Sequence, residues 1–138
     1  MAQKMRDVMT TAPSTVDASD PIAAAAAVMA RENIGDVIVT DGKRICGIVT
    51  DRDIAVRGVA HGLDASTQVG AICSGHLTTT TQGVSVDRAV ELMRAHAVRR
   101  LPVVDKGRPI GIVSLGDLAQ RRDRNSALAK ISGAPPNR

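Results

Sequence analysis

Apolar residues recur at helical spacing in two segments of the chain. This pattern predicts two amphipathic helices, each with one apolar stripe that packs on a core. Asp20 followed by Pro21 favours a start of the first helix there, because Asp caps free backbone N–H groups and Pro fits the first helical position. The stripe residues are Ile22, Ala25, Ala26, Met29 and Ala30 in the first segment, and Val86, Ala89, Val90, Met93 and Ala97 in the second.

Each predicted helix is followed by two short runs of aliphatic residues that are separated by a turn. A turn between two runs of β-branched residues predicts a β-hairpin. A threonine-rich extended segment precedes each helix and a second helix follows each hairpin, so the predicted order is β-α-β-β-α. The predicted strands are 37–40 with 45–49 and 101–104 with 110–113; short apolar turns lie at 5–9 and 69–73, extended segments at 14–16 and 77–81, and second helices begin at Asp51 and Leu115.

The two sets of elements are copies of one repeat. When residues 8–57 are shifted by 64 positions onto residues 72–121, no gap is needed and 12 of the 50 pairs are identical. A repeat of about 60 residues buries little surface by itself, so we expect the copies to share a core. The expected organisation is a first domain at 5–61, a linker at 62–68, a second domain at 69–122 and a tail at 123–138, fraying from residue 131.

The most specific motif closes each hairpin: a glycine, two apolar residues, a hydroxyl residue and, three residues later, an aspartate. It occurs as GIVTDRD at 47–53 and as GIVSLGD at 111–117. A strand that runs into a helix start presents free backbone N–H groups and the positive end of the helix dipole, where ligand oxygens can be held. The duplicated motif therefore indicates two equivalent small-ligand sites, although the same hydroxyl and carboxylate also suit a simple helix cap.

Together with RRLPVVD at 99–105, these features make residues 5–122 resemble a tandem pair of cystathionine-β-synthase-type (CBS) domains, known as a Bateman module. The resemblance implies an α/β (α+β) fold of two pseudo-twofold-related β-α-β-β-α repeats that form one module. It implies clefts that bind adenosyl ligands (AMP, ADP, ATP or S-adenosylmethionine), with no other cofactor required. Many family members dimerise and regulate an attached enzyme, channel or transporter. No such domain is visible in this sequence, so we expect a stand-alone pair that signals to an unknown protein partner.

The resemblance also assigns binding roles to individual positions. The first repeat has Gly35-Asp36 where the second has two arginines, and a carboxylate near a phosphate is repulsive, so we expect unequal clefts. The arginine pair has an alternative role in closing the end of the preceding helix. The assigned residues are Asp53 and Asp117 for the ribose; Thr50 and Ser114 as the hydroxyl positions; Thr15, Val16, Ile38, Thr79, Thr80 and Pro102 for the adenine pocket; and Arg99 and Arg100 for phosphate.

Composition limits the chemistry of these sites. The chain has no Phe, Trp or Tyr, so a base must be held between aliphatic groups and nucleic acid cannot be bound by aromatic stacking. The formal net charge of +4 fits either a solvated surface or anionic ligands. Cys46 and Cys73 replace apolar residues of the other repeat and are expected to be small core residues. A Cys73–His76 metal pair is the alternative, although two ligands alone are a weak signal.

These observations favour a non-enzymatic adenine-nucleotide sensor that forms a homodimer. A dimerising scaffold with vestigial sites and a nucleic-acid-binding regulator with a basic C-terminal helix are the alternatives. No helix-turn-helix or zinc motif supports nucleic-acid binding. An enzyme is disfavoured because no histidine has a recognisable nucleophile partner in the sequence. No stretch reaches the roughly 20 apolar residues of a membrane span, and no signal peptide is visible, so we expect a cytoplasmic protein.

Overall fold

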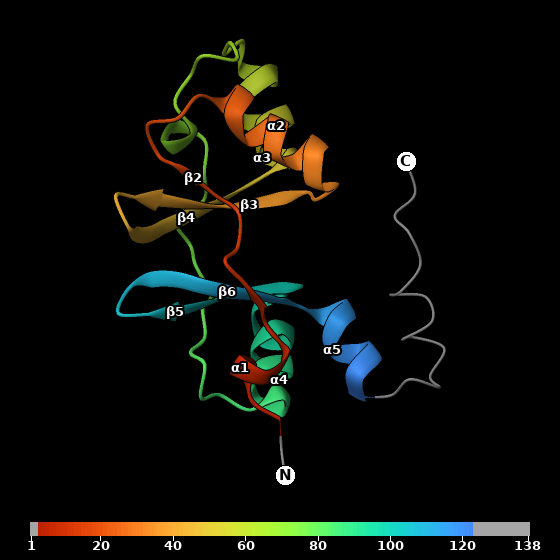
Figure 1. The fold of residues 1–138 in the computed structure, drawn as a ribbon. Helices are drawn as coiled ribbons and strands as arrows, with labels where there is room; N and C mark the ends of the chain where they lie inside the picture. Colours follow the sequence, from red (N-terminus) through yellow and green to blue (C-terminus); the bar gives the residue numbers. More distant parts are fainter. Residues whose placement is uncertain (1–2, 123–138) are drawn as a thin grey trace. The chain divides into compact units, whose positions relative to one another are not determined.

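The computed structural model of the chain describes residues 3–122, and for residues 120–122 it describes the backbone alone. The expected tail at 123–138 lies outside the described residues. The chain divides into two compact units, each with a three-stranded sheet and helices (Figure 1). The N-repeat unit comprises Pro13–Leu77 with Lys106–Pro109, and the C-repeat unit comprises the chain up to Ala12, Thr78–Asp105 and the chain from Ile110 onward. The predicted mixed α/β fold is confirmed.

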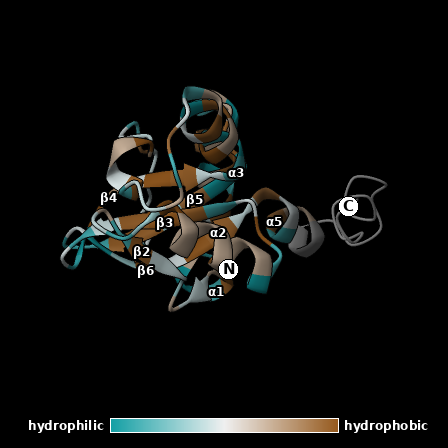
Figure 2. Cartoon of the chain, turned by 90° about the horizontal axis from the view of Figure 1, so that it is seen from above, coloured by the Kyte–Doolittle hydropathy of each residue, from teal (hydrophilic) through white to brown (hydrophobic). Residues whose placement is uncertain are grey.

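The sheet of the N-repeat unit has the strand order β2-β3-β4. Strand β2 (Thr15–Asp17) is parallel to β3 (Asp36–Asp41), and β3 forms an antiparallel hairpin with β4 (Arg44–Thr50). Helix α2 (Ile22–Glu32) follows β2 and covers one face of the sheet. Strand β3 carries the most hydrophobic stretch of this sheet, and Figure 2 shows it in brown.

The predicted stripe of α2 is correct in part. Ile22, Ala25 and Met29 are buried, but Ala26 and Ala30 are exposed, and Val28 is buried in their place. A run of alanines gives no hydrophobic contrast around the helix, so the larger Val28 decides which side faces the core. The helix also begins one residue later than predicted. The Asp20 carboxylate accepts from the Asp17 N–H instead of capping the helix.

The C-repeat unit contains α4 (Val86–His96), β5 (Arg100–Asp105), β6 (Arg108–Ser114) and α5 (Leu115–Arg122). Its core is formed by Met93 of α4 and residues of β5, β6 and α5. Ala97, predicted in the α4 stripe, is exposed and ends the helix in the left-handed conformation with φ of 54°. The extended segment predicted at 77–81 is not a strand; only Thr80 forms a parallel bridge, to Val103.

The helical segment after the hairpin differs between the units. In the C-repeat unit α5 is one continuous α-helix. In the N-repeat unit α3 (Asp51–Asp53) continues as a π-helical segment η1 (Ile54–Gly58) and a 3₁₀ segment η2 (Val59–His61). The repeat therefore predicts the position of this helix in both copies but not its form.

The segment that opens each repeat packs in the unit of the other repeat. Helix α1 (Met5–Val8) belongs to the C-repeat core, and β1 (Thr10–Thr11) pairs with β6. Correspondingly, η3 (Val69–Ala71) and the residues after it pack in the N-repeat unit, where Ser74 bridges Ile48 of β4. Each unit therefore contains the segment that opens the other repeat: α1 in the C-repeat unit and η3 in the N-repeat unit. Within residues 3–122, no helix is long and apolar enough to cross a membrane.

Candidate functional site

In the N-repeat unit the duplicated motif forms a reciprocal cap at the start of α3. The Asp53 N–H donates to Thr50 Oγ1 at 3.0 Å, and the Thr50 N–H donates to Asp53 Oδ2 at 2.9 Å. Such a capping box satisfies two backbone groups that a helix start leaves unpaired. The other carboxylate oxygen, Oδ1, lies 3.8 Å from Nε of Arg57, and the Asp53 side chain is 15% exposed. The carboxylate is therefore fixed in orientation and still has acceptor sites on both oxygens.

The register of the sheet places three of the predicted residues on one face. Thr15 pairs with Ile38, and Thr50 pairs with Asp36, two residues before Ile38. Paired residues, and residues two apart, project from the same face of a sheet. Because Val37 and Val39 point into the core, Thr15, Ile38 and Thr50 face away from α2. Val16 packs in that core, so only its backbone could contact a ligand on the opposite face.

A second carboxylate, Asp51, which is not among the residues predicted for the site, lies at this end of the sheet. The Asp51 N–H donates to the Gly35 carbonyl at 2.9 Å. A Cβ atom at Gly35 would lie 3.2 Å from Asp51 Oδ2, so this carboxylate packs over the glycine. Together with Asp36 and Asp53, it makes this end of the N-repeat unit acidic. The sequence signal for this carboxylate is that Asp51 stands where the other repeat has Leu115.

The C-repeat unit repeats the cap with fewer contacts. The Asp117 N–H donates to Ser114 Oγ at 3.1 Å. Among the described residues, the exposed Asp117 carboxylate has no hydrogen bond or ion pair. The Leu115 N–H donates to the Arg99 carbonyl at 2.7 Å, as Asp51 does to Gly35. The backbone geometry at the helix start is therefore the same in both units.

The predicted adenine residues of the C-repeat unit lie beside β5. The Thr80 N–H donates to the Pro102 carbonyl at 3.0 Å, and the Val104 N–H donates to the Thr80 carbonyl at 2.9 Å. Pro102 is fully buried, on the face of β5 opposite to the core residues Leu101 and Val103, and Thr79 is half-buried. Thr80 takes the place of Val16 and is 4% exposed, and its hydroxyl has no hydrogen-bond partner among the described residues.

The arginine pair lies at the start of β5. Arg99 is exposed and Arg100 is half-buried. They take the positions of Gly35 and Asp36, so this end of the C-repeat unit carries positive charge where the N-repeat unit carries three carboxylates. The two candidate sites therefore share backbone geometry and differ in charge.

The cysteines lie in the N-repeat unit as partly buried residues beside its core. Burial raises the pKa of the Cys73 thiol, and the nearby Asp53 carboxylate adds to that increase. Burial also raises the pKa of Cys46, with a further contribution from Cys73. Among the described residues, no group of three or more His, Cys, Asp or Glu side chains is placed to hold a metal ion.

Comparison with known proteins identifies the family. The model of the CBS domain matches residues 5–58 and 69–123. The CBS domain-containing protein YhcV of Bacillus subtilis is 40% identical over 132 residues, which cover 93% of this chain and 94% of that protein. Hypoxic response protein 1 of Mycobacterium tuberculosis is 34% identical over 117 residues, covering 83% of this chain and 82% of that protein.

Solved structures agree with this result. The crystal structure of Hypoxic Response Protein I, which contains two coordinated zinc ions, matches with a TM-score of 0.79 and 32% identity over 86% of this chain and 98% of that one. The CBS domain pair of protein MJ0100, solved with 5′-methylthioadenosine and S-adenosyl-L-methionine, matches in fold with a TM-score of 0.78 and 23% identity over 91% of this chain and all of that one, at 100%. The two matches to the domain model fall on the two sequence repeats. The chain therefore belongs to the CBS-domain family and contains two CBS domains in tandem.

Proposed function

We propose that this CBS pair is a non-catalytic regulatory module that binds an adenosyl ligand, namely AMP, ADP, ATP or S-adenosylmethionine, and signals its presence to a partner protein. The duplicated cap carries the proposal. In both units the backbone N–H of an aspartate, Asp53 or Asp117, donates to the hydroxyl residue three positions earlier, which places the aspartate in the first turn of a helix. An ionised carboxylate accepts strong hydrogen bonds from the two hydroxyls of a ribose.

The sheet residues supply the rest of a nucleoside site. Ile38 and Pro102 are fully buried and would contact a base through the backbone of β3 and β5, whereas the exposed Thr15 and the half-buried Thr79 lie next to them on segments whose backbone can read the adenine edge. Val16 and Thr80 contribute through the backbone and, for Thr80, through its buried hydroxyl. The adenosyl ligands of the MJ0100 pair support this ligand class for a chain of the same fold.

The two sites differ in the part of the ligand that carries charge. Arg99 and Arg100 favour phosphate groups at the C-repeat site, since arginine binds phosphate with charge-assisted bonds. Asp36 and Asp51 disfavour phosphate at the N-repeat site. That site therefore prefers a ligand with fewer phosphates or with an uncharged tail. The cationic S-adenosylmethionine also fits it.

A calorimetric titration with AMP, ADP, ATP and S-adenosylmethionine tests the proposal. We expect Asp53→Ala and Asp117→Ala each to weaken binding about tenfold to a hundredfold, because a hydrogen bond to a charged group contributes roughly 1.5–3 kcal/mol. Asp53→Asn can still accept from the Thr50 N–H, so it separates loss of the ligand contact from loss of the cap.

Asp7→Ala is a matched control. The Asp7 carboxylate accepts from the Lys4 N–H at 2.9 Å at the start of α1, with no predicted site beside it. Its removal should lower stability and leave the affinity unchanged.

If none of the four ligands binds the wild-type chain, the sites are vestigial and the pair is a scaffold. The proposal also includes a homodimer, a cytoplasmic location and the sequence-based boundaries 5–61 and 69–122.

A further inference from the structure

Arg57 contacts two parts of the N-repeat unit that are distant in the sequence. Its Nε atom lies 3.8 Å from Oδ1 of Asp53, the carboxylate of the proposed ribose site, and its Nη1 atom donates to the Ile72 carbonyl at 3.5 Å. The Arg57 side chain is 56% exposed, whereas Ile72 is buried in the core. One guanidinium therefore connects the start of α3 to the segment that opens the second repeat.

That segment, residues 69–74, is here called the crossing segment. Its first part packs in the core of the N-repeat unit, and its end pairs with β4. The Ser74 N–H donates to the Ile48 carbonyl at 2.9 Å, and the Ile48 N–H donates to the Ser74 carbonyl at 3.1 Å. Because this is an isolated bridge outside the named strands, its stability depends on neighbouring contacts such as that of Arg57.

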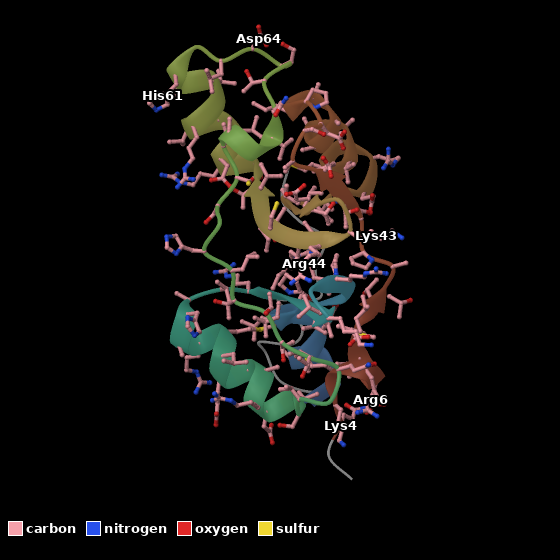
Figure 3. The ribbon with its side chains drawn as sticks, turned by 90° about the vertical axis from the view of Figure 1, so that its left-hand side faces the viewer. Lys4, Arg6, Lys43, Arg44, His61 and Asp64 are labelled. Atoms are coloured by element: carbon pink, nitrogen blue, oxygen red, sulfur yellow. The ribbon has the colours of Figure 1, made fainter. Side chains whose placement is uncertain are left out.

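The crossing segment also connects the two proposed sites along the chain. Figure 3 shows the chain at the end of η2, at His61, and in the outer loop, at Asp64, before it returns to β4. Beyond the segment the chain continues into Thr79 and Thr80, which belong to the proposed C-repeat site. The segment is therefore part of the covalent connection from one proposed site to the next.

The charges of Asp53 and Arg57 both act on Cys73, which lies inside the crossing segment. Burial raises the pKa of the Cys73 thiol, the Asp53 carboxylate raises it further, and the Arg57 guanidinium acts in the opposite direction. The absence of a side chain at Gly47 makes room for this thiol, since a Cβ atom there would lie 3.0 Å from Cys73 Sγ. The ion pair and the crossing segment are therefore neighbours in the folded unit.

Both repeats place an arginine four residues after the aspartate of the duplicated motif. Arg57 follows Asp53, and Arg121 follows Asp117. In the N-repeat unit this arginine lies on the π-helical segment η1, a form of helix that is frequent at functional sites. The arginine therefore belongs to the same repeated pattern as the proposed ribose carboxylate.

The contacts of Arg57 set the direction of a coupling between the ligand and the crossing segment. While the segment is docked on β4, the Ile72 carbonyl holds the guanidinium beside Asp53, and the carboxylate keeps one orientation. At 3.8 Å the Nε atom is beyond hydrogen-bond distance, so the lone pairs of Asp53 Oδ1 stay available to a ribose hydroxyl. Docking of the segment therefore favours ligand binding. Thermodynamic reciprocity then requires the ligand to favour docking by the same factor.

We propose that Arg57 is a positioning residue that couples ligand binding at the N-repeat site to docking of the crossing segment on β4. This coupling rests on the proposed adenosyl-binding function and adds a regulatory step at the same site. Arg57 acts through Asp53 and the Ile72 carbonyl, and the docked segment is the signal of an occupied site.

Amide hydrogen exchange measured by NMR tests the contact without ligand. The Ser74 amide is protected while the crossing segment is paired with β4, so its exchange rate reports docking. Arg57→Gln should raise this rate about two- to fivefold, the range that an exposed ion pair allows. The Val104 amide, which donates to the Thr80 carbonyl in the C-repeat unit, should not change. Arg52→Gln removes the same charge from an exposed position of α3 and should affect neither amide.

The same exchange measurement with ligand tests the coupling. Asp117→Ala weakens the C-repeat site, so this background reports the N-repeat site, and calorimetry selects the ligand from AMP, ADP, ATP and S-adenosylmethionine. At saturation the ligand should slow exchange of Ser74 about two- to fivefold, and it should have no such effect when Arg57→Gln is added. The affinity should fall by the same factor in Arg57→Gln.

Arg57→Lys separates charge from geometry. Lysine keeps the positive charge, but its compact ammonium group lacks the planar fork with which arginine reaches two acceptors. We expect this variant to lose the effect of ligand on Ser74 exchange, as Arg57→Gln does. Coupling of wild-type size in Arg57→Lys would overturn the two-sided contact.

The remaining outcomes distinguish the two proposals. If none of the four ligands binds the wild-type chain, the proposed function and the coupling both fail. If a ligand binds and the exchange of Ser74 stays the same, the coupling fails and the proposed function stands. Unchanged exchange of Ser74 in ligand-free Arg57→Gln would show that Arg57 does not hold the crossing segment, and this too would overturn the coupling.

Discussion

Gly47 lies so close to Ser74 that no side chain fits between them. A Cβ atom at position 47 would be 2.7 Å from the Ser74 carbonyl oxygen and 3.0 Å from Cys73 Sγ. The neighbouring Ile48 exchanges two backbone hydrogen bonds with Ser74, of 2.9 and 3.1 Å. Gly111 makes the equivalent close contact with the segment that opens the first repeat, since a Cβ atom at position 111 would be 2.6 Å from Met9 Sδ. The glycine of the duplicated motif therefore allows a close contact that a side chain would block in both units.

Gly47→Ala should lower the free energy of unfolding by about 1–3 kcal/mol, the usual effect of overpacking a tight contact. The measurement is chemical denaturation followed by circular dichroism. Gly75→Ala is the control, because a Cβ there has no atom within 4 Å and should change stability by less than about 0.5 kcal/mol. Equal effects of the two substitutions would show that the Ser74 contact can relax at little cost.

Thr80→Val should raise stability and weaken ligand binding together. A buried hydroxyl without a hydrogen-bond partner costs roughly 1–3 kcal/mol, and the first repeat places Val16 at the equivalent position. We expect a gain of about 1 kcal/mol in the free energy of unfolding. If a bound nucleoside supplies the missing partner, affinity should fall in the same variant.

Thr40→Val provides the comparison for Thr80→Val. The Thr40 hydroxyl donates to the Val16 carbonyl at 3.4 Å, so its removal should bring no gain in stability. Stabilisation of Thr80→Val without any loss of affinity would remove its hydroxyl from the proposed site while leaving the packing argument intact.

Replacing Arg99 and Arg100 with alanine should weaken ATP binding far more than adenosine binding. Only the phosphates gain from the two guanidinium groups, and the ATP affinity of the wild type should fall as salt screens them. Calorimetry of both ligands at two salt concentrations measures this. The double variant of Arg88 and Arg94 removes the same charge from α4 and should spare ATP. An equal loss for ATP and adenosine would assign the arginine pair to folding.

Lowering the pH should remove the contribution that the ionised Asp17 carboxylate makes to the stability of the fold. Hydrogen bonds from the side chain and backbone of Ser19 hold the pKa of Asp17 below its ordinary value of 3.8, and Gly42 N–H adds to this. A carboxylate with a lowered folded pKa stabilises the fold above pH 3.8 and loses this contribution as pH falls through the folded pKa. Asp17→Asn should therefore be less stable than wild type at pH 7, with a difference that shrinks below about pH 4. Urea midpoints at several pH values measure it; a constant difference would contradict the titration.

Sequence periodicity predicted the elements that are defined by apolar contrast. The hairpin Asp36–Asp41 and Arg44–Thr50 lies within one or two residues of the expected runs, and α4 agrees closely because charged residues alternate with its core positions. The buried side of α2 was predicted less well, because five consecutive alanines give no hydrophobic contrast and the burial of Val28 determines the orientation of the helix. The π-helical segment Ile54–Gly58 has no local signature and arises from how the chain packs after Asp53.

The candidate site was predictable where it depends on a motif and hidden where it depends on packing. The hydroxyl of each motif caps the start of α3 or α5 as expected, and in α3 the Asp53 carboxylate completes the cap. The position of Asp51 over Gly35 and the contact of Arg57 with Asp53 require the folded backbone. The roles of these residues toward a ligand remain predictions, and the titrations above test them.

The crossing of opening segments between the units has a consequence for how such a chain could arise. A gene for a single repeat would encode a unit that lacks α1 or η3, because each of these lies in the unit of the other repeat. Two such molecules could complete each other only by exchanging their N-terminal arms. Duplication and fusion of that gene would convert this exchange between molecules into a connection within one polypeptide. A chain cut between residues 62 and 68 should therefore regain its fold only when both halves are present, as two fragments that complement each other.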